Sequence, residues 1–263
     1  MNTLLKNGVI VLNLVAFKIG PVPVYWYGII IALAIAAGYL AARRLGKPFG
    51  LESGVFDEFM LWVIPAALIG ARVWYVLFNL NYYSLYPGKI FAIWEGGMAI
   101  HGGIFAGLAV ALIWTRVKKI HFFRFADIAS VALLLGQAIG RWANYVNQEA
   151  YGIPTELPWA MYIAGEYRHP TFLYESIWNL LLFFGLWYYL NHRPHSGKVF
   201  GLYLAGYSFG RFIIESLRTD SLMLGSFRVA QLVSVVLFVA GTLIFLLVGT
   251  QKRKTDSVAD NKN

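Results

Sequence analysis

The sequence predicts an all-α polytopic membrane protein with about seven transmembrane helices. Apolar residues make up 59% of the chain and charged residues only 13%, whereas an average soluble domain carries about 25% charged residues. The apolar residues form blocks of about 18 or more, the length that a helix needs to cross a hydrocarbon core of roughly 30 Å. Most basic residues lie between these blocks and not inside them. Together these observations place the chain in lipid.

The apolar blocks define the expected helices in chain order. Their ranges are 25–43, 56–78, 98–115, 122–140, 172–190, 198–217 and 229–249. An apolar stretch at 8–17 precedes them; it is too short to span and is expected to lie at the membrane surface. Residues 1–250 are expected to form a single transmembrane domain, and residues 251–263 a disordered cytoplasmic tail.

The loops alternate between two charge classes, and this alternation predicts the orientation. The positive-inside rule places the more basic loops in the cytoplasm, so the N-terminus is expected outside and the C-terminus inside. The segment at about 141–171 then forms a small outer head. The more basic set contains Arg43, Arg44, Lys47, Arg116, Lys118, Lys119, Arg124, Arg193, Lys198, Lys252, Arg253, Lys254 and Lys262.

Several classes of function are disfavoured by composition. The net charge is +9, but the basic residues flank apolar blocks instead of forming a stripe with aromatic residues, so no nucleic-acid partner is expected. The chain has no cysteine, which excludes a disulfide, a thiolate metal site and a cysteine nucleophile of its own. Any thiol chemistry must use a thiol of the substrate. No metal or organic cofactor is implied, because the histidines lack the spacing of metal ligands.

Ionisable residues gather at one end of the expected helices. Inserting an arginine at the centre of a membrane helix costs about 2.5–3.5 kcal/mol of free energy, so each ionisable residue in such a helix is expected to have a structural or functional role. Successive helices run in opposite directions, and these residues alternate between late and early positions in their helices; all of them are therefore expected at the outer face. They are Arg72, His101, Arg141, Glu175, Arg211 and Glu215.

The sixth expected helix carries the clearest pattern. Tyr207, Arg211 and Glu215 are spaced four residues apart, and Arg218 follows on roughly the same helical face. At a rise of 1.5 Å per residue, Arg211 lies roughly 20 Å from Lys198 at the cytoplasmic end, within the outer leaflet. An arginine there can bind a lipid phosphate. The alternative is an internal Arg211–Glu215 ion pair that only fixes helix packing.

Three further motifs are open to similar pairs of interpretations. Arg141 ends an expected helix and is followed by Asn144 and Glu149, a set of groups that suits a phosphate or a plain interfacial boundary. His101 precedes two glycines, and imidazole suits proton transfer near neutral pH, although a histidine at this boundary can also be inert. Glu175 can hold an arginine or the histidine in place, or merely stabilise the start of its helix.

Five motifs together resemble the prolipoprotein diacylglyceryl transferases. They are WYG at 26–28, HGG at 101–103, GRWANYVNQEAYG from Gly140, HPTFLYE from His169 and GYSFGRFIIESLR from Gly206. The resemblance implies transfer of an sn-1,2-diacylglyceryl group from phosphatidylglycerol to the lipobox cysteine thiol of a prolipoprotein, the first step of lipoprotein maturation. The products would be a thioether and glycerol 1-phosphate, and the enzyme would be a multi-pass protein of the bacterial cell membrane with its active site toward the outer leaflet.

The resemblance also assigns residues. It implies that Arg141 and Arg211 are essential and that the preprolipoprotein signal peptide and phosphatidylglycerol are the partners. We expect His101 to act in catalysis as well, as acceptor of the thiol proton or as an orienting group, and Arg72 and Glu175 to have supporting roles. The remaining residues implied for the lipid-binding site are Tyr27, Asn144, Glu149, Gly152, Tyr207, Glu215 and Arg218.

Two other classes of protein fit the buried charges. A transporter or ion pathway would also place Arg, Glu and His inside a membrane, but its polar groups should reach both faces. The inner halves of the expected helices offer little beyond Asp57, Glu58 and Asp127. A lipid-binding scaffold would need neither His101 nor a thiol-bearing partner. Formation of a thioether-linked lipid in vitro would separate the transferase from both alternatives.

Overall fold

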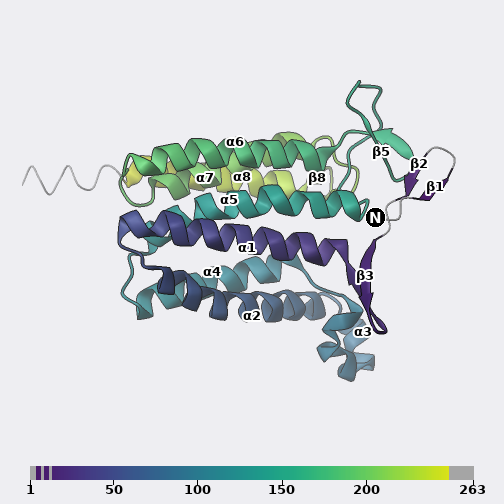
Figure 1. Ribbon diagram of the computed structural model, residues 1–263, viewed down its shortest axis with the longest axis horizontal. Helices are drawn as coiled ribbons and strands as arrows, with labels where there is room; N and C mark the ends of the chain where they lie inside the picture. The colour runs from purple at the N-terminus through teal and green to yellow at the C-terminus, as the bar shows by residue number, and fades with distance from the viewer. Residues whose placement is uncertain (1–3, 7–8, 12–13, 249–263) are drawn as a thin grey trace, which may run out of the picture. The chain divides into compact units, whose positions relative to one another are not determined.

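The computed structural model describes residues 4–6, 9–11 and 14–248 of the chain (Figure 1). The expected tail at 251–263 lies outside the described residues. Each of the expected helical ranges coincides with a helix of 18 residues or more, which confirms the helical assignment. These helices are α1 (Trp26–Gly46), α2 (Ser53–Leu77), α4 (Ile100–Val117), α5 (Phe122–Val146), α6 (Thr171–Asn191), α7 (Lys198–Glu215) and α8 (Val229–Leu247).

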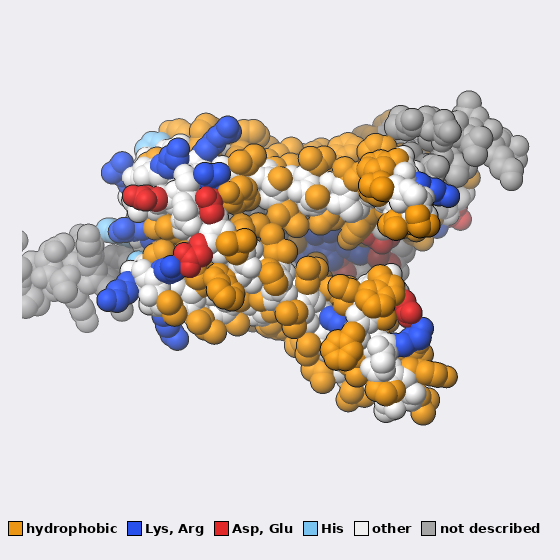
Figure 2. Space-filling model, turned by 60° about the horizontal axis from the view of Figure 1, so that its bottom comes forward, with side chains coloured by type: hydrophobic (Ala, Val, Ile, Leu, Met, Phe, Trp, Pro, Cys, Tyr) orange, Lys and Arg blue, Asp and Glu red, His pale blue; other side chains and the backbone are white. Residues whose placement is uncertain are grey.

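Five of these helices, α1, α2, α4, α5 and α8, are long and apolar enough to cross a membrane. The other two, α6 and α7, have a suitable length but are less apolar. In α7 the cause is visible in the sequence, because Lys198, Arg211 and Glu215 all fall within its 18 residues. The mostly helical membrane fold is therefore confirmed, while seven crossings and their orientation stay predictions. In Figure 2, hydrophobic side chains cover much of the helix surface in view, and Lys and Arg side chains lie mainly near helix ends.

The chain forms two compact units. The first comprises residues 1–42 and 126–263, and therefore holds most of α1 and α5 together with α6, α7 and α8. The second comprises residues 43–125 and holds α2, α4 and shorter helical pieces. The short pieces are η1 (Lys47–Phe49), α3 (Leu80–Leu85), η2 (Pro87–Phe91) and η3 (Ile93–Glu95). The expectation of a single catalytic domain stays a prediction.

Glycines let helix backbones approach closely within each unit. In the first unit, a Cβ atom placed on Gly201 of α7 would lie 2.7 Å from the carbonyl oxygen of Gly241 in α8. In the second, a Cβ atom on Gly70 of α2 would lie 2.6 Å from the carbonyl oxygen of Gly102 in α4. Small residues at such crossings are typical of helices packed in lipid, where close van der Waals contact replaces the hydrophobic effect as the driving force.

In the described part of the chain, four two-stranded antiparallel hairpins lie before or between the helices, and the all-α prediction contains none of them. Their strands have two to five residues, too few to give a recognisable alternating pattern. Two hairpins precede α1, one lies in the expected outer head, and one joins α7 to α8. They are β1 (Leu4–Lys6) with β2 (Val9–Val11), β3 (Val15–Ile19) with β4 (Val22–Tyr25), β5 (Met161–Ile163) with β6 (Glu166–Arg168), and β7 (Met223–Leu224) with β8 (Phe227–Arg228).

Candidate functional site

The C-terminal parts of α5 and α7 and the N-terminal part of α6 bring charged side chains together around Glu175. This carboxylate lies in the second turn of α6 and is 4% exposed. Its Oε2 lies 2.5 Å from Nη2 of Arg141 on α5, and its Oε1 accepts a hydrogen bond of 2.7 Å from Nη1 of Arg211 on α7. One buried carboxylate thus joins two arginines from different helices. Of the partners that the sequence left open for Glu175, the structure shows arginines in contact with it; its role stays a prediction.

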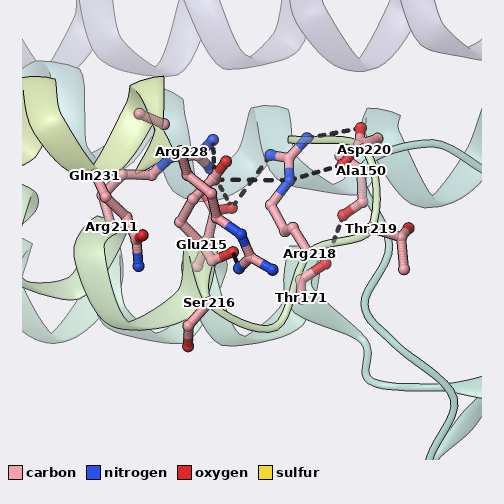
Figure 3. A network of polar contacts seen from close by, with 12 residues as sticks. Ala150, Thr171, Arg211, Glu215, Ser216, Arg218, Thr219, Asp220, Arg228 and Gln231 are labelled. Atoms are coloured by element: carbon pink, nitrogen blue, oxygen red, sulfur yellow. Dashed lines mark hydrogen bonds and ion pairs between the residues drawn. The ribbon is translucent and has the colours of Figure 1, made fainter. Parts of the chain in front are cut away.

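The end of α7 completes the cluster (Figure 3). Nη2 of Arg211 lies 2.7 Å from Oε2 of Glu215, as the four-residue spacing predicts. Nε of Arg218 lies 3.8 Å from the same oxygen, and its Nη2 forms an ion pair of 2.8 Å with Asp220. Arg228, at the start of α8, donates a hydrogen bond from Nη1 to the backbone carbonyl of Glu215. The Arg211–Glu215 pair is therefore part of a network that extends over three helices.

The cluster has an excess of positive charge. With Arg228 counted, four guanidinium groups meet the three carboxylates of Glu175, Glu215 and Asp220. Arg141, Arg211 and Arg218 form ion pairs with the buried carboxylates of Glu175 and Glu215. The side chains of the three arginines are 19%, 18% and 11% exposed, respectively. Each guanidinium has more donors than these ion pairs use. The arrangement favours a further anion with several oxygen acceptors, such as a phosphate.

A row of polar side chains continues from Arg141 along the contact between α5 and α7. Nη2 of Arg141 lies 3.3 Å from the hydroxyl oxygen of Tyr207, to which it donates a hydrogen bond. The Tyr207 ring stacks against Tyr203 with centroids 5.9 Å apart, and Gln137 donates a hydrogen bond of 3.1 Å to the Tyr203 hydroxyl. At the opposite end of α7, the Asp127 carboxylate on α5 accepts backbone N–H groups at residues 197 and 200, at 2.6 and 2.7 Å. These bonds fix α7 against α5.

The structure corrects the position of Arg141 in its helix. The sequence places Arg141 at the end of a helix that stops near residue 140, with Asn144 in the following loop. In the structure α5 continues to Val146. The physical reason is that the segment RWANYV contains neither Gly nor Pro and so does not break the helix. Arg141 and Asn144 are therefore both helical residues.

The loop after α5 approaches the cluster closely at Gly152. Its backbone N–H donates to the carbonyl of His169 at 3.1 Å, and the residue forms an isolated β-bridge with Arg218. A Cβ atom at this position would lie only 2.6 Å from Cβ of His169. Glycine is therefore needed for the close approach of this loop to His169.

Three other residues of the candidate site lie at the start of α1, at the end of α5 and in the loop after α5. Asn144 donates a hydrogen bond of 2.9 Å to Oε1 of Glu149. Tyr27, near the start of α1, is 38% exposed and is close enough to Glu149 and Arg141 to interact with both electrostatically. The first unit therefore brings together the candidate residues of α1, α5, α6 and α7.

Arg72 and His101 belong to the second unit. Arg72 is buried at 7% exposure. Its guanidinium donates to the carbonyls of Ile90 (2.8 Å), Gly96 (2.6 Å), Gly97 (2.9 Å), Lys89 (2.6 Å) and Ala92 (3.3 Å). This residue organises the segment between α3 and α4. His101 is the second residue of α4 and is exposed.

Sequence reasoning missed parts of the network. The sequence analysis singles out none of Arg228, Gln137 and Tyr203. A usable signal exists for the last two, because each precedes a candidate residue by four positions, Gln137 before Arg141 and Tyr203 before Tyr207. No sequence signal identifies Arg228, whose bond is to a backbone carbonyl.

Comparison with known proteins shows which family the chain is similar to. The family model of the prolipoprotein diacylglyceryl transferases matches residues 14–247. The chain belongs to this family. Among its relatives, the phosphatidylglycerol–prolipoprotein diacylglyceryl transferase of Limosilactobacillus reuteri is 44% identical over 251 residues, covering 90% of this chain and 91% of the relative. That of Bacillus velezensis is 43% identical, covering 89% and 92%, and that of Fervidobacterium nodosum is 44% identical, covering 92% and 87%.

For this member of the diacylglyceryl transferase family, the match covers both compact units and every candidate residue. Arg141, Arg211 and Arg218, which the motifs single out, share two buried carboxylates. The structure brings together in the first unit several of the residues that the resemblance implies for a lipid-binding site. The individual roles of these residues stay predictions.

Proposed function

We propose that this protein transfers the sn-1,2-diacylglyceryl group of phosphatidylglycerol to the lipobox cysteine of a prolipoprotein. The cysteine sulfur forms a bond to the glyceryl carbon that carries the phosphate ester, and the bond between this carbon and the ester oxygen breaks. The products are a thioether-linked prolipoprotein and glycerol 1-phosphate. The thiol proton passes to a base.

The observation that carries this proposal is the bridge that Glu175 makes between Arg141 and Arg211. Breaking the ester bond leaves an additional negative charge on the phosphate, and guanidinium groups held in advance can stabilise that charge as it develops. Because Glu175 is buried, it holds the two arginines in position before the lipid binds. Arg218 and Tyr207 extend this set on either side.

We further propose roles for the other candidate residues. Asn144, Glu149, Gly152, Tyr27 and Glu215 shape the phosphatidylglycerol site, and Arg72 supports the protein by holding the segment that precedes α4. His101 accepts the proton of the substrate thiol. A free cysteine has a pKa of about 8.5, so only a few per cent is thiolate at neutral pH and a base accelerates the reaction.

The proposed arrangement in the membrane follows the charge pattern of the loops. All seven long helices cross the plasma membrane, the N-terminus lies outside and the arginine cluster faces the outer leaflet. The polar side chains of α6 and α7 that reduce the apolar character of these helices pack against one another within the first unit, as the Glu175–Arg211 bond illustrates. Such inward-facing polar residues are compatible with crossing a membrane.

The test is a transfer reaction with defined components. The purified protein is incubated with acyl-labelled phosphatidylglycerol and a peptide that contains the lipobox cysteine, and mass spectrometry detects the peptide. We expect a thioether-linked diacylglyceryl peptide and an equal amount of glycerol 1-phosphate. A peptide with serine in place of cysteine is the control. Absence of the thioether product would contradict the proposal and favour a transporter or scaffold. The same yield from Arg141→Ala would contradict the role proposed for the arginine cluster.

A further inference from the structure

The backbone hydrogen bonds change at the C-terminal end of α7. In a continuing α-helix the N–H group of Ser216 would donate to the carbonyl of Phe212, but it donates to the carbonyl of Ile213 at 3.1 Å. The N–H groups of Leu217 and Arg218 also bond to the residue three positions earlier, at 3.0 and 3.1 Å. Many helices end in such a 3₁₀ turn. Here it deprives the carbonyl of Phe212 of the N–H group of Ser216.

Two side chains of the segment that begins α8 donate to carbonyls at this end of α7. Nε2 of Gln231 donates to the carbonyl of Phe212 at 3.2 Å, and Nη1 of Arg228 donates to the carbonyl of Glu215, the last residue of α7 (Figure 3). The last carbonyls of a helix carry a partial negative charge, so a guanidinium group is favourable there. Gln231 thus supplies the donor that Ser216 withholds from Phe212.

The two bonds share one antiparallel register between α7 and α8. Glu215 follows Phe212 by three residues, and Arg228 precedes Gln231 by three residues. Residues that are three apart lie on the same face of a helix. Arg228 and Gln231 therefore act on the same turn of α7 as a pair.

This turn determines where Arg218 lies. The N–H group of Arg218 donates to the carbonyl of Glu215, the same carbonyl that Arg228 binds. The turn brings Nε of Arg218 to 3.8 Å from Oε2 of Glu215, while Nη2 of Arg211 lies 2.7 Å from that oxygen. A change in the turn would therefore move the guanidinium group of Arg218 relative to that of Arg211.

We propose that Arg228 and Gln231 are positioning residues that hold Arg218 beside Arg211 for binding of a phosphate. Among the described residues, no ion pair joins Arg228 to a carboxylate, and its bond to α7 is made to the backbone. Gln231 has no charge and likewise bonds to the backbone. The inference rests on the proposed function, because the phosphate is that of phosphatidylglycerol.

The test measures binding of acyl-labelled phosphatidylglycerol to the full chain in phosphatidylcholine nanodiscs. The peptide is omitted, so no transfer takes place. Gln231→Leu and Arg228→Met should each weaken binding by about three- to tenfold, the factor that one hydrogen bond contributes. Arg228→Lys should restore most of the affinity, because lysine keeps a donor and the charge. The control is Thr242→Val, since the Thr242 hydroxyl donates at 2.8 Å within α8.

A double-mutant cycle separates positioning from a general effect on stability. If Gln231 acts through Arg218, Gln231→Leu should have little further effect on binding in an Arg218→Met background. An equal loss of affinity in both backgrounds would overturn the proposal. An effect of Arg228→Met without any effect of Gln231→Leu would also overturn it, because that result would indicate a direct contact between Arg228 and the phosphate.

The same measurements distinguish failure of this inference from failure of the proposed function. Wild-type protein that binds phosphatidylglycerol no better than phosphatidylcholine would contradict the proposed lipid site itself. Selective binding by the wild type that Gln231→Leu leaves unchanged would overturn only the positioning role. Should Arg228→Met not fold, the cycle with Gln231→Leu decides, because the bond of Gln231 is exposed and its loss leaves no buried group unpaired.

Discussion

Arg211 binds Glu175 across the contact between α6 and α7 at 2.7 Å, and the second oxygen of the same carboxylate lies 2.5 Å from Arg141. Glu175 of α6 thus connects α5 and α7 through ion pairs. A phosphate that binds here would meet guanidinium groups that are already oriented. Binding would therefore cost less free energy for ordering the arginine side chains. The following predictions test the parts of this arrangement separately.

Glu175→Gln should be among the most damaging single changes to the first unit. An amide cannot neutralise two guanidinium groups, and removing one partner from a buried ion pair costs about 3–5 kcal/mol. We expect a lower unfolding temperature and a roughly 100-fold loss of transfer activity, since about 1.4 kcal/mol corresponds to a factor of ten. Glu166→Gln is the control, because that carboxylate is 56% exposed in its pair with Arg168. Similar activities for the two variants would refute the bridging role.

Arg141→Lys should reduce kcat/KM by at least about tenfold. The Nη2 atom of Arg141 contacts both Glu175 and Tyr207, and the compact ammonium group of lysine cannot present the planar, paired donors of a guanidinium. Steady-state kinetics with phosphatidylglycerol as the varied substrate would measure the loss. Arg44→Lys, at the exposed end of α1, should leave kcat/KM unchanged. Near-normal turnover of Arg141→Lys would exclude a phosphate clamp at this residue.

His101→Gln should impair transfer more at pH 7 than at pH 9. If His101 removes the thiol proton, its loss matters most where the cysteine is protonated, and a cysteine with a pKa of about 8.5 is largely ionised at pH 9. Initial rates across this pH range would reveal the difference. His192→Gln, on a different segment, serves as the matched control. An equal fractional loss at both pH values would leave His101 with an orienting role only.

Gly152→Ala should destabilise the loop that approaches Arg218. The added methyl group would lie 2.6 Å from Cβ of His169 and 2.9 Å from its carbonyl oxygen, and overpacking of this kind costs about 1–3 kcal/mol. Thermal unfolding and the transfer rate should both fall. Gly185→Ala in α6 provides the comparison, because a Cβ atom there meets nothing within 4 Å. If the two alanine variants unfold at the same temperature, close approach at Gly152 is not a constraint.

Much of the fold could be predicted because lipid imposes a simple rule on sequence. Apolar length alone located the long helices, and four-residue spacing predicted the bond between Arg211 and Glu215. The extension of α5 past Arg141 could not be predicted from apolar length, since a helix that leaves the hydrocarbon core can continue with polar residues. The hairpins could not be predicted either, because strands of two to five residues are too short to show a periodic pattern.

The candidate site was predictable in part. Charged residues stand out in an apolar chain, so the members on α5, α6 and α7 were found. The sequence left open which side chain Glu175 contacts, because Glu175 and Arg141 are far apart in sequence and only the fold brings them together. The carbonyl partners of Arg72 and Arg228 leave no trace in side-chain identity, since every residue has a carbonyl group. Bonds to the backbone are therefore the contacts that sequence reasoning misses most readily.

Carboxylates form hydrogen bonds with α7 near both of its ends. Asp127 binds the N–H groups at its first turn, and Glu175 binds Arg211 near its other end. If α7 moved along its axis, the hydrogen bonds to Asp127 and to Glu175 would both break. We therefore expect α7 to stay in place when a lipid reaches the arginines. Side chains or neighbouring segments should move instead.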